Sequence, residues 1–437
     1  GTGTQANRNP VHENGIGNVY REGERMKRLK RSVVIIGGGP AGLAAAAALF
    51  DRGIRDVMIL EREKNLGGIL RQCIHDGFGL TRFGCALSGP EYADRFINRV
   101  QETGIEIYTN TTVLSVSPDK KVLAASSEGF LEIQSSAVVL AMGCRERTRG
   151  ALAIPGERPC GVWTAGTAQA YLNLYNHMIG REAVILGSGD IGLIMARRMT
   201  LEGIKVAGVF EILPYPSGLP RNIEQCLNDY SIPLYLRHTV TEIHGSSRLT
   251  GVTVSEVDEN RRPIAGTERE YSCDTLIISA GLIPENDLSL SAGIVLDPAT
   301  QGAVVDENYQ TVQEGIFAAG NVLHVHDLVD FVSLEAERMA ESIARYLESG
   351  GLPVCGLTVA RGEKIGHIVP QRISGTKDVH LSLRVNTPLS DCVIQIRQAG
   401  KPIQEFHRKR AIPAEMLEFV IPAEKITKQG DLEVTVR

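Results

Sequence analysis

One run of eighteen residues, VVIIGGGPAGLAAAAALF at positions 33–50, limits most strongly what this chain can fold into. Its β-branched start predicts a short buried strand, and its alanine-rich end predicts a helix. Between them Gly37, Gly39 and Gly42 form the pattern Gly-x-Gly-x-x-Gly. Such a turn lets the backbone approach a pyrophosphate at the helix N-terminus, and Glu61, which closes the next apolar run, stands where an acid binds ribose hydroxyls. Strand, turn, helix and acid together predict a dinucleotide site.

The same pattern occurs a second time in the chain. A short apolar strand leads into Gly187, Gly189 and Gly192, a helix follows, and Glu211 closes the next apolar run. The step from the first glycine to the acid is 24 residues in both copies. Two copies of one nucleotide-binding unit indicate two dinucleotides, which we infer to be a flavin and a nicotinamide.

The order of strands and helices predicts the fold class. Each copy ends in an apolar strand closed by glycine, at Gly143 and at Gly281. Strands that alternate with helices predict a parallel, doubly wound sheet. We therefore expect an α/β protein with two Rossmann-like doubly wound domains, the second inserted in the first, and a small C-terminal all-β domain of short alternating runs. The expected bounds are 26–150 with 286–350 for the first domain, 151–285 for the second and 356–437 for the third. Further helices are predicted over 89–103, 163–178 and 332–350.

The first residues lack this order. Residues 1–25 have no periodicity, so we expect a disordered leader or an added segment, with Met26 as the natural start. The basic run at 25–31 is interpreted as a solvated lead-in to the first strand.

Composition excludes several classes of function. A hydrophobic content of 43% and a charged content of 22% are typical of a globular enzyme. The net charge of −5 gives no electrostatic reason to bind nucleic acid or an anionic membrane. The glycine turn interrupts the one long apolar run, so no membrane span is expected. Eight cysteines are scattered without zinc or iron–sulfur spacing, which favours reduced thiols and a cytoplasmic location.

With these motifs the chain resembles the flavoproteins with two dinucleotide-binding domains, the superfamily of pyridine nucleotide–disulfide oxidoreductases. The resemblance covers residues 32–350 and rests on both glycine loops, the strand-end glycines and the run GIFAAGN at 315–321. It implies that the first domain binds FAD, that the second binds NAD(P)H, and that the chain is an oxidoreductase dependent on both.

Longer runs are similar to narrower groups. The run GGILRQCIHDGFGLTRFG at 67–84 resembles flavoproteins associated with glycerol-3-phosphate dehydrogenase-like enzymes and, more distantly, the flavin subunits of opine oxidase and hydrogen cyanide synthase. This likeness implies an oligomer with a redox partner subunit, such as a glycerol-3-phosphate dehydrogenase-like protein.

The resemblance also assigns cofactor contacts to positions that match the family's motifs. For FAD these are Gly37, Gly39, Pro40, Ala41, Gly42, Glu61, Arg62, Gly68, Val113, Ala141, Gly143, Gly320, Asn321 and Val332. For NAD they are Gly187, Gly189, Asp190, Ile191, Gly192, Glu211 and Gly281. The acid at 211 repels a 2′-phosphate and no arginine follows it in EILPYPSG, so NAD(H) is favoured over NADP(H). The N-terminus of the helix at 332–350 is expected to face the pyrimidine edge of the flavin.

The chain departs from the family pattern in two places. Asn321 stands where an aspartate is usual, and it keeps a hydrogen-bonding group without the charge. Cys73 has no partner at CxxC or CxxxxC spacing, so no redox-active disulfide motif is present and disulfide reduction is not expected.

Other reactive side chains are weak candidates. No catalytic acid–base pair is identifiable, and the catalytic candidates are Cys73 and His75, on a loop where relatives place groups beside the flavin ring; simple packing is the alternative for both. His324 and His326 alternate along the chain, but no further ligands cluster with them in sequence. We therefore expect no metal there and interpret the pair as part of a structural or flavin-proximal loop.

Three functions remain open. The leading one is an FAD-dependent oxidoreductase that transfers a hydride between NAD(H) and flavin, with electron transfer to or from a partner or small molecule. The second is the FAD subunit of an amino-acid, opine or hydroxy-acid dehydrogenase without nicotinamide turnover. The third is a non-catalytic, redox-responsive binding module.

Overall fold

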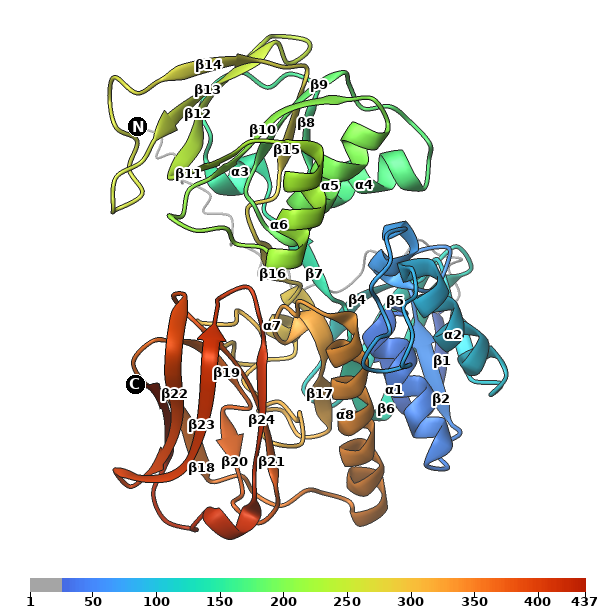
Figure 1. Ribbon diagram of the computed structural model, residues 1–437. Helices are drawn as coiled ribbons and strands as arrows, with labels where there is room; N and C mark the ends of the chain where they lie inside the picture. The colour runs from blue at the N-terminus through green and yellow to red at the C-terminus, as the bar shows by residue number, and fades with distance from the viewer. Residues whose placement is uncertain (1–25) are drawn as a thin grey trace, which may run out of the picture.

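The computed structural model describes residues 26–437, which fold into three parts (Figure 1). The chain begins the first part, crosses into the second, returns to the first and then builds the third. The predicted leader, residues 1–25, lies outside the described residues.

The first part is built on a seven-stranded sheet of order β3-β2-β1-β6-β5-β4, with β17 paired to the end of β6. Its strands are β1 (Met26–Ile36), β2 (Val57–Leu60), β3 (Glu106–Tyr108), β4 (Thr112–Val116), β5 (Lys121–Ser126), β6 (Gly129–Leu140) and β17 (Ile316–Ala318). Its helices are α1 (Pro40–Asp51), η1 (Gly68–Gln72), α2 (Gly89–Gln101), α7 (Asp287–Ser291), η3 (Gly320–Val322) and α8 (Val329–Ser349).

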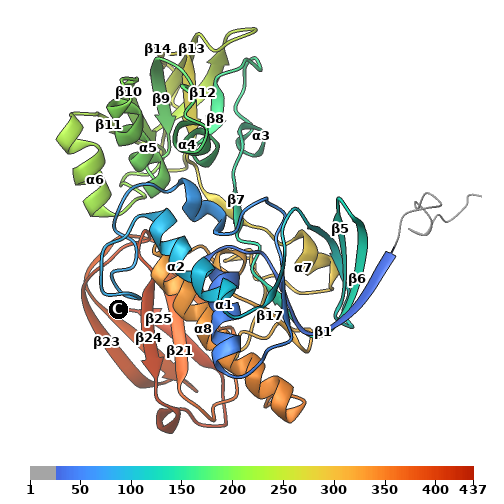
Figure 2. The ribbon, with the colours of Figure 1, turned by 90° about the vertical axis from the view of Figure 1, so that its right-hand side faces the viewer.

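Small side chains let the helices of this part pack closely. The alanines at 44–48 of α1 are at most 6% exposed, and α1 lies between α2 and α8 (Figure 2). Helix α2 begins with a capping box in which Ser88 and Glu91 satisfy each other's backbone amides. The predicted helix at 89–103 is therefore confirmed, whereas α8 begins three residues before its predicted start.

Two expectations about this sheet are wrong. Residues 26–31 pair with β6, so the basic run belongs to β1 and is not a lead-in to it. The sheet is also mixed at one edge, because β5 runs antiparallel to β6 and β4 runs antiparallel to β5. The short connections between these strands allow only antiparallel neighbours, since a parallel crossover needs a dozen residues or more.

The second part holds a wholly parallel five-stranded sheet of order β11-β10-β9-β15-β8 and an antiparallel sheet of order β12-β13-β14. Its strands are β8 (Val162–Thr164), β9 (Glu182–Leu186), β10 (Lys205–Glu211), β11 (Leu234–Leu236), β12 (His238–His244), β13 (Gly251–Glu256), β14 (Arg269–Ser272) and β15 (Thr275–Ile278). Its helices are α3 (Arg149–Leu152), α4 (Ala165–Asn173), α5 (Asp190–Leu201), α6 (Pro220–Cys226) and η2 (Asn228–Tyr230).

The helix predicted over 163–178 is wrong at both ends. Residues 162–164 form β8, because they pair with β15 at the edge of the parallel sheet. The helix itself, α4, ends at Asn173. Long-range strand pairing has overridden a local helical pattern here.

The chain crosses between the first two parts on a pair of antiparallel strands, β7 (Cys144–Glu146) and β16 (Leu282–Pro284). Arg145 pairs with Glu285 at 3.3 Å, and Glu146 Oε1 accepts a hydrogen bond of 2.7 Å from the Gly166 amide of α4. The crossover therefore holds the two parts through charged side chains as well as backbone.

The third part consists of strands and one short 3-10 helix. Its strands are β18 (Leu357–Arg361), β19 (Ile365–Val369), β20 (Arg372–Ile373), β21 (Val379–Val385), β22 (Leu389–Gln398), β23 (Lys401–Ala411), β24 (Leu417–Ile421) and β25 (Leu432–Val436), and its helix is η4 (Ala423–Lys425). They form two sheets, β20-β18-β25-β22-β23 and β19-β21-β24, around an apolar core of their own. Across residues 26–437 no helix combines the length and the apolar character that a membrane crossing requires.

Candidate functional site: two glycine loops and their acids

The first glycine loop has a shape that only glycine allows. Gly37 has a φ of +107°, and a Cβ added there would lie 2.3 Å from the carbonyl oxygen of Ala141. A Cβ on Gly42 would lie 1.9 Å from the carbonyl oxygen of Gly37, so strand and helix touch through this glycine. At Gly39 the nearest atom is 3.9 Å away, and this side of the turn is open to a ligand.

Glu61 is buried at the end of β2 and points into the turn. Its Oε2 accepts a hydrogen bond of 2.7 Å from the Gly38 amide, and its Oε1 accepts one of 2.7 Å from the Glu63 amide. A carboxylate has about four acceptor positions. Within residues 26–437 two positions of Glu61 remain open, and the sequence predicts that they bind ribose hydroxyls.

The second loop repeats this geometry. Gly187 has a φ of +97°, and a Cβ there would lie 2.1 Å from the Ser279 carbonyl oxygen. Glu211 accepts hydrogen bonds from the Ser188 amide at 2.9 Å and from the Leu213 amide at 3.0 Å. These partners correspond in position to Gly38 and Glu63, the partners of Glu61. In each loop one amide comes one residue after the first glycine, and the other comes two residues after the acid. Both sites therefore fit a dinucleotide by the shape of their glycine cradles.

The second acid has only uncharged partners. Every hydrogen bond that Glu211 accepts within residues 26–437 comes from a backbone amide or from the hydroxyls of Ser188 and Ser217. Asp190, at the start of α5, accepts from the Leu219 amide and the Asn222 side chain, both at 2.7 Å, and so fixes the segment that follows β10.

A third turn faces the first loop. Gly320 has a φ of +77°, and a Cβ there would lie 2.9 Å from the Ala41 side chain and 3.2 Å from that of Val332. Three residues predicted to contact FAD therefore meet at one point. Asn321 donates to Cys144 Sγ at 3.6 Å, and its Oδ1 accepts a hydrogen bond of 3.0 Å from the His326 amide.

A family model, described as pyridine nucleotide-disulphide oxidoreductase, matches residues 31–342, which include both loops and the third turn. The chain belongs to this family. It is therefore an oxidoreductase that depends on FAD and a pyridine nucleotide, and the interpretation as a non-catalytic binding module loses its support.

Individual relatives are distant. The hydrogen cyanide synthase subunit HcnB of Pseudomonas aeruginosa is 25% identical over 70% of this chain and 68% of that protein. A subunit of opine oxidase from Agrobacterium tumefaciens is 24% identical over 66% of this chain and 60% of that protein. The crystal structure of T. acidophilum thioredoxin reductase superposes with a TM-score of 0.60 at 23% identity, over 72% of this chain and 98% of that one, which shows a shared fold.

The remaining predicted contacts of this oxidoreductase differ in their surroundings. Gly68 lies against Gly39, since its Cβ would be 3.1 Å from the Gly39 Cα. Val113 is partly buried on β4, whereas the Arg62 side chain is 68% exposed. The other predicted contacts lie in or next to elements already described: Pro40 begins α1, Gly143 follows β6, Ile191 and Gly192 lie in α5, and Gly281 lies beside Arg147.

The catalytic candidates lie on the seam loop (residues 73–88), between η1 and α2. Cys73 Sγ is 3.7 Å from Gln169 Oε1 of α4, so it sits where the first two parts meet. Burial raises the pKa of the Cys73 thiol to about 12, which keeps it protonated and unreactive at neutral pH. Burial lowers the pKa of His75, whose ring is 4.9 Å from that of Phe78. Their roles at the flavin stay predictions; all eight cysteines of the chain are free.

Sequence reasoning missed the residue that holds this loop. Asp330, buried in the first turn of α8, accepts hydrogen bonds from the amides of Gly79, Thr81 and Arg82 at 2.9, 2.7 and 3.3 Å. The only signal in the sequence was an acid near a helix start, which usually has a capping role. Its partners lie some 250 positions away in the chain.

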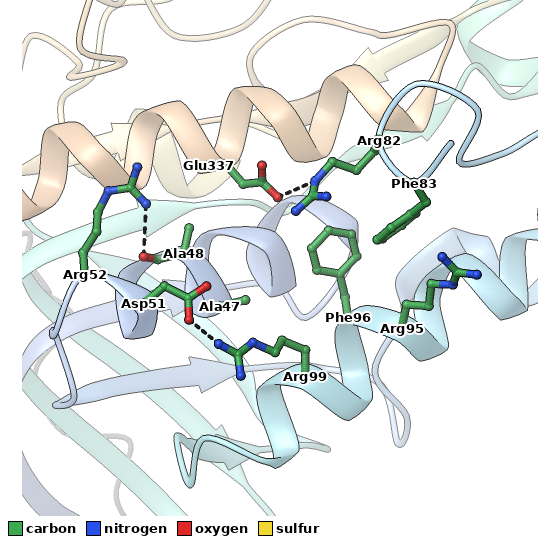
Figure 3. A pocket seen from close by; sticks show the side chains of 10 residues that line it. All are labelled: Ala47, Ala48, Asp51, Arg52, Arg82, Phe83, Arg95, Phe96, Arg99 and Glu337. Carbon is green, nitrogen blue, oxygen red and sulfur yellow. Dashed lines mark hydrogen bonds and ion pairs between the residues drawn. The ribbon is translucent and has the colours of Figure 1, made fainter. Parts of the chain in front are cut away.

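A hollow of about 420 Å³ opens between α1, α2 and α8 (Figure 3). It is rich in arginine, but Arg82 donates to Glu337 at 2.8 Å and Arg99 is paired with Asp51. None of the predicted cofactor residues lines it. The hollow is therefore separate from the two glycine loops.

Proposed function

We propose that this chain transfers a hydride between NAD(H) and FAD and passes electrons to or from a partner subunit or small molecule. In this proposal residues 26–150 and 286–350 form the FAD-binding domain, 151–285 form the NAD-binding domain, and 356–437 form a separate β-domain. The repeated loop geometry carries the proposal, because each acid holds the matching pair of backbone amides.

The preference for NAD(H) rests on the surroundings of Glu211. NADP(H) carries a 2′-phosphate, which needs a cationic partner near the ribose. Within residues 26–437 Glu211 accepts only from amides and serine hydroxyls, and Asp190 adds a second carboxylate at the start of α5. The site therefore presents negative charge, which disfavours a phosphate, and the ribose hydroxyls would replace the hydroxyls of Ser188 and Ser217 on Glu211.

The side chains and helices of the chain would each have a defined part. The N-termini of α1 and α5 face the two pyrophosphates, which their unpaired amides and dipoles stabilise. Glu61 and Glu211 orient the two riboses, and Asn321 offers its amide to the hydroxyls of the flavin side chain. FAD, when bound, supplies the ring that exchanges the hydride, and the protein supplies orientation and exclusion of water.

The first experiment is an anaerobic titration of the purified, flavin-loaded chain with NADH, followed by visible absorbance. We expect the flavin bands to bleach near one equivalent of NADH and to respond much less to NADPH. A flavin that stays oxidised under NADH would overturn hydride transfer for the isolated chain, and a chain that binds no flavin on reconstitution would overturn the first site.

The two acids provide a matched pair of variants. Glu61→Gln should reduce the flavin content while NADH binding is preserved, because only the first ribose contact is weakened. Glu211→Gln should leave the flavin content unchanged and raise the KM for NADH, and it should narrow the preference for NADH over NADPH. Effects on the opposite cofactor in both variants would show that the two loops have been assigned wrongly.

A second candidate function is the FAD subunit of an amino-acid, opine or hydroxy-acid dehydrogenase. It is supported by relatives that are themselves named as subunits, of hydrogen cyanide synthase and of opine oxidase. This function predicts flavin reduction by such a substrate, alone or with a partner chain, in preparations that NADH does not reduce.

A further inference from the structure

Two histidines and a glutamate form a buried cluster beneath the turn at Gly320. His324 and His326 follow η3, and Glu335 comes from the second turn of α8; their side chains are at most 2% exposed. His324 Nε2 lies 2.6 Å from Glu335 Oε2, and His326 Nε2 lies 3.5 Å from the same oxygen. One ligand atom from each of the three residues lies within 4.8 Å of the others.

The outward-facing atoms of this cluster are already held in place. Glu335 Oε1 accepts a hydrogen bond of 2.7 Å from the Gly320 amide, and His326 Nδ1 is 3.3 Å from Asn321 Oδ1. Metal-bound histidines and carboxylates are oriented in this way by hydrogen bonds on the side away from the metal. Glu335 Oε2 is hydrogen-bonded to His324 Nε2 at 2.6 Å and has His326 Nε2 3.5 Å away, so an ion bound here would take the place of the proton between these atoms.

Two buried imidazole nitrogens beside the cluster have no partner. His324 Nδ1 and His367 Nε2 are both buried and make no hydrogen bond within residues 26–437. The His367 ring, on β19 of the third part, is 5.9 Å from the His324 ring at an angle of 88°. A buried polar atom without a partner is unusual in a folded protein, so His367 Nε2 points to a missing ligand or water. His324 would bind such a ligand through Nε2, the nitrogen that faces Glu335.

The spacing of the rings suits a shared ion. With metal–nitrogen distances of 2.0–2.1 Å, two imidazoles on one tetrahedral ion have ring centres about 5 Å apart. The His324 ring is 4.2 Å from the His326 ring and 5.9 Å from the His367 ring, which brackets that value. The ring separations are therefore compatible with one shared ion.

The nearby cations do not neutralise the buried carboxylate. Arg384 of β21 pairs with Asp327 at 3.1 Å, and Arg338 of α8 lies 3.6 Å from Glu418 of β24. The negative charge of Glu335 must therefore be balanced by the histidines or by a bound cation. A buried charge is retained only when it is paired or coordinates a metal.

We propose that His324, His326 and Glu335 bind one divalent transition-metal ion of the zinc class, with His367 as the fourth ligand. Imidazole nitrogens and a carboxylate oxygen are ligands that zinc accepts, and three nitrogens with one oxygen would complete a tetrahedral shell. The ion would join the turn at Gly320, helix α8 and the third part of the chain. This site lies outside both glycine loops and does not depend on which electron donor the enzyme uses.

The test uses the full chain without a polyhistidine tag. After dialysis against a weak chelator, the metal content of the wild type is measured by mass spectrometry, and chelator-stripped protein is titrated with Co²⁺. We expect close to one equivalent of retained metal and the visible bands of tetrahedral cobalt. A folded wild type that retains no stoichiometric metal and gives no cobalt bands would overturn the proposal.

Variants locate the ion. His326→Ala and Glu335→Gln should weaken metal binding by about 100-fold or more, since each removes a ligand and not merely a supporting contact. His380→Ala, on the exposed side of β21 next to β19, is the matched control and should bind like the wild type. Equal retention by all variants would show adventitious surface binding and refute the site. If the ligand variants fail to fold, His367→Gln decides the matter, because its loss should shift the cobalt bands of a folded protein.

Discussion

The contact between Gly42 and Gly37 gives the sharpest quantitative prediction. We expect Gly42→Ala to destabilise the first part and to release flavin, because a methyl group at this position meets backbone that cannot rotate away. The equivalent change in the second loop, Gly192→Ala, should do less. The difference between the two follows from their distances to the neighbouring backbone.

The magnitude can be worked from those distances. The added Cβ would lie 1.9 Å from the Gly37 oxygen, whereas ordinary contact begins at 3.4 Å, so the turn must retreat by roughly 1.5 Å. For Gly192 the distance to the Gly187 oxygen is 2.7 Å, and the retreat is roughly 0.7 Å. Overpacking of this kind costs about 1–3 kcal/mol, so we expect a cost of about 3 kcal/mol for Gly42→Ala and about 1 kcal/mol for Gly192→Ala. In a domain of this size each kcal/mol lowers the melting temperature by about 2–4 °C.

The assay compares melting temperature with the ratio of flavin to protein in the purified variants. We expect a drop of about 6–12 °C and a marked loss of flavin for Gly42→Ala. Gly192→Ala should lose only about 2–4 °C and keep its flavin, with a raised KM for NADH. The control is Gly351→Ala, where a Cβ would meet nothing within 4 Å. If Gly42→Ala melts like this control and keeps its flavin, the argument from close packing is refuted.

Three further results are expected. Because burial raises the pKa of Cys73 to about 12, on the order of 10⁻⁴ of this thiol is ionised at pH 8, and its thiolate fraction grows only as the pH rises toward that value. Peptide mass spectrometry after alkylation should therefore find the exposed Cys160 labelled first. Faster labelling of Cys73 would contradict its burial. Tyr92→Phe removes the buried hydrogen bond of 2.8 Å to Ser333 and should cost about 1–3 kcal/mol, seen as a lower melting temperature; an unchanged value would mean that water replaces the bond. Asp330→Asn should loosen the seam loop, so that limited proteolysis cuts it sooner than in the wild type; equal cleavage rates would show that other contacts hold the loop.

The two glycine loops could be predicted from the sequence because each is formed by residues that lie close together in the chain. A strand, a glycine turn, a helix and an acid all fall within a few tens of residues, and the turn requires glycine for steric reasons that no distant contact changes. The structure accordingly finds Gly37 and Gly187 at positive φ, and both acids bonded to the turns.

Two of the errors occurred where pairing partners are distant in the chain. Residues 26–31 were predicted to be a charged lead-in, yet they form a strand because β6 lies beside them. Residues 163 and 164 were predicted to be helical, yet they belong to a strand that pairs with β15. A strand's hydrogen bonds are made with another segment, so its own sequence specifies them weakly.

By itself the sequence determined the fold class of the first two parts, the two glycine turns and the acids bonded to them, since all of these follow from local periodicity and backbone sterics. Only the tertiary structure decided that Asp330 holds the seam loop and that Glu335 and His367 meet the two histidines after η3. These residues come from separate elements, and the physical reason they meet is the packing of α8 and β19 around one turn. Contacts of that kind depend on topology, which no short stretch of the chain contains.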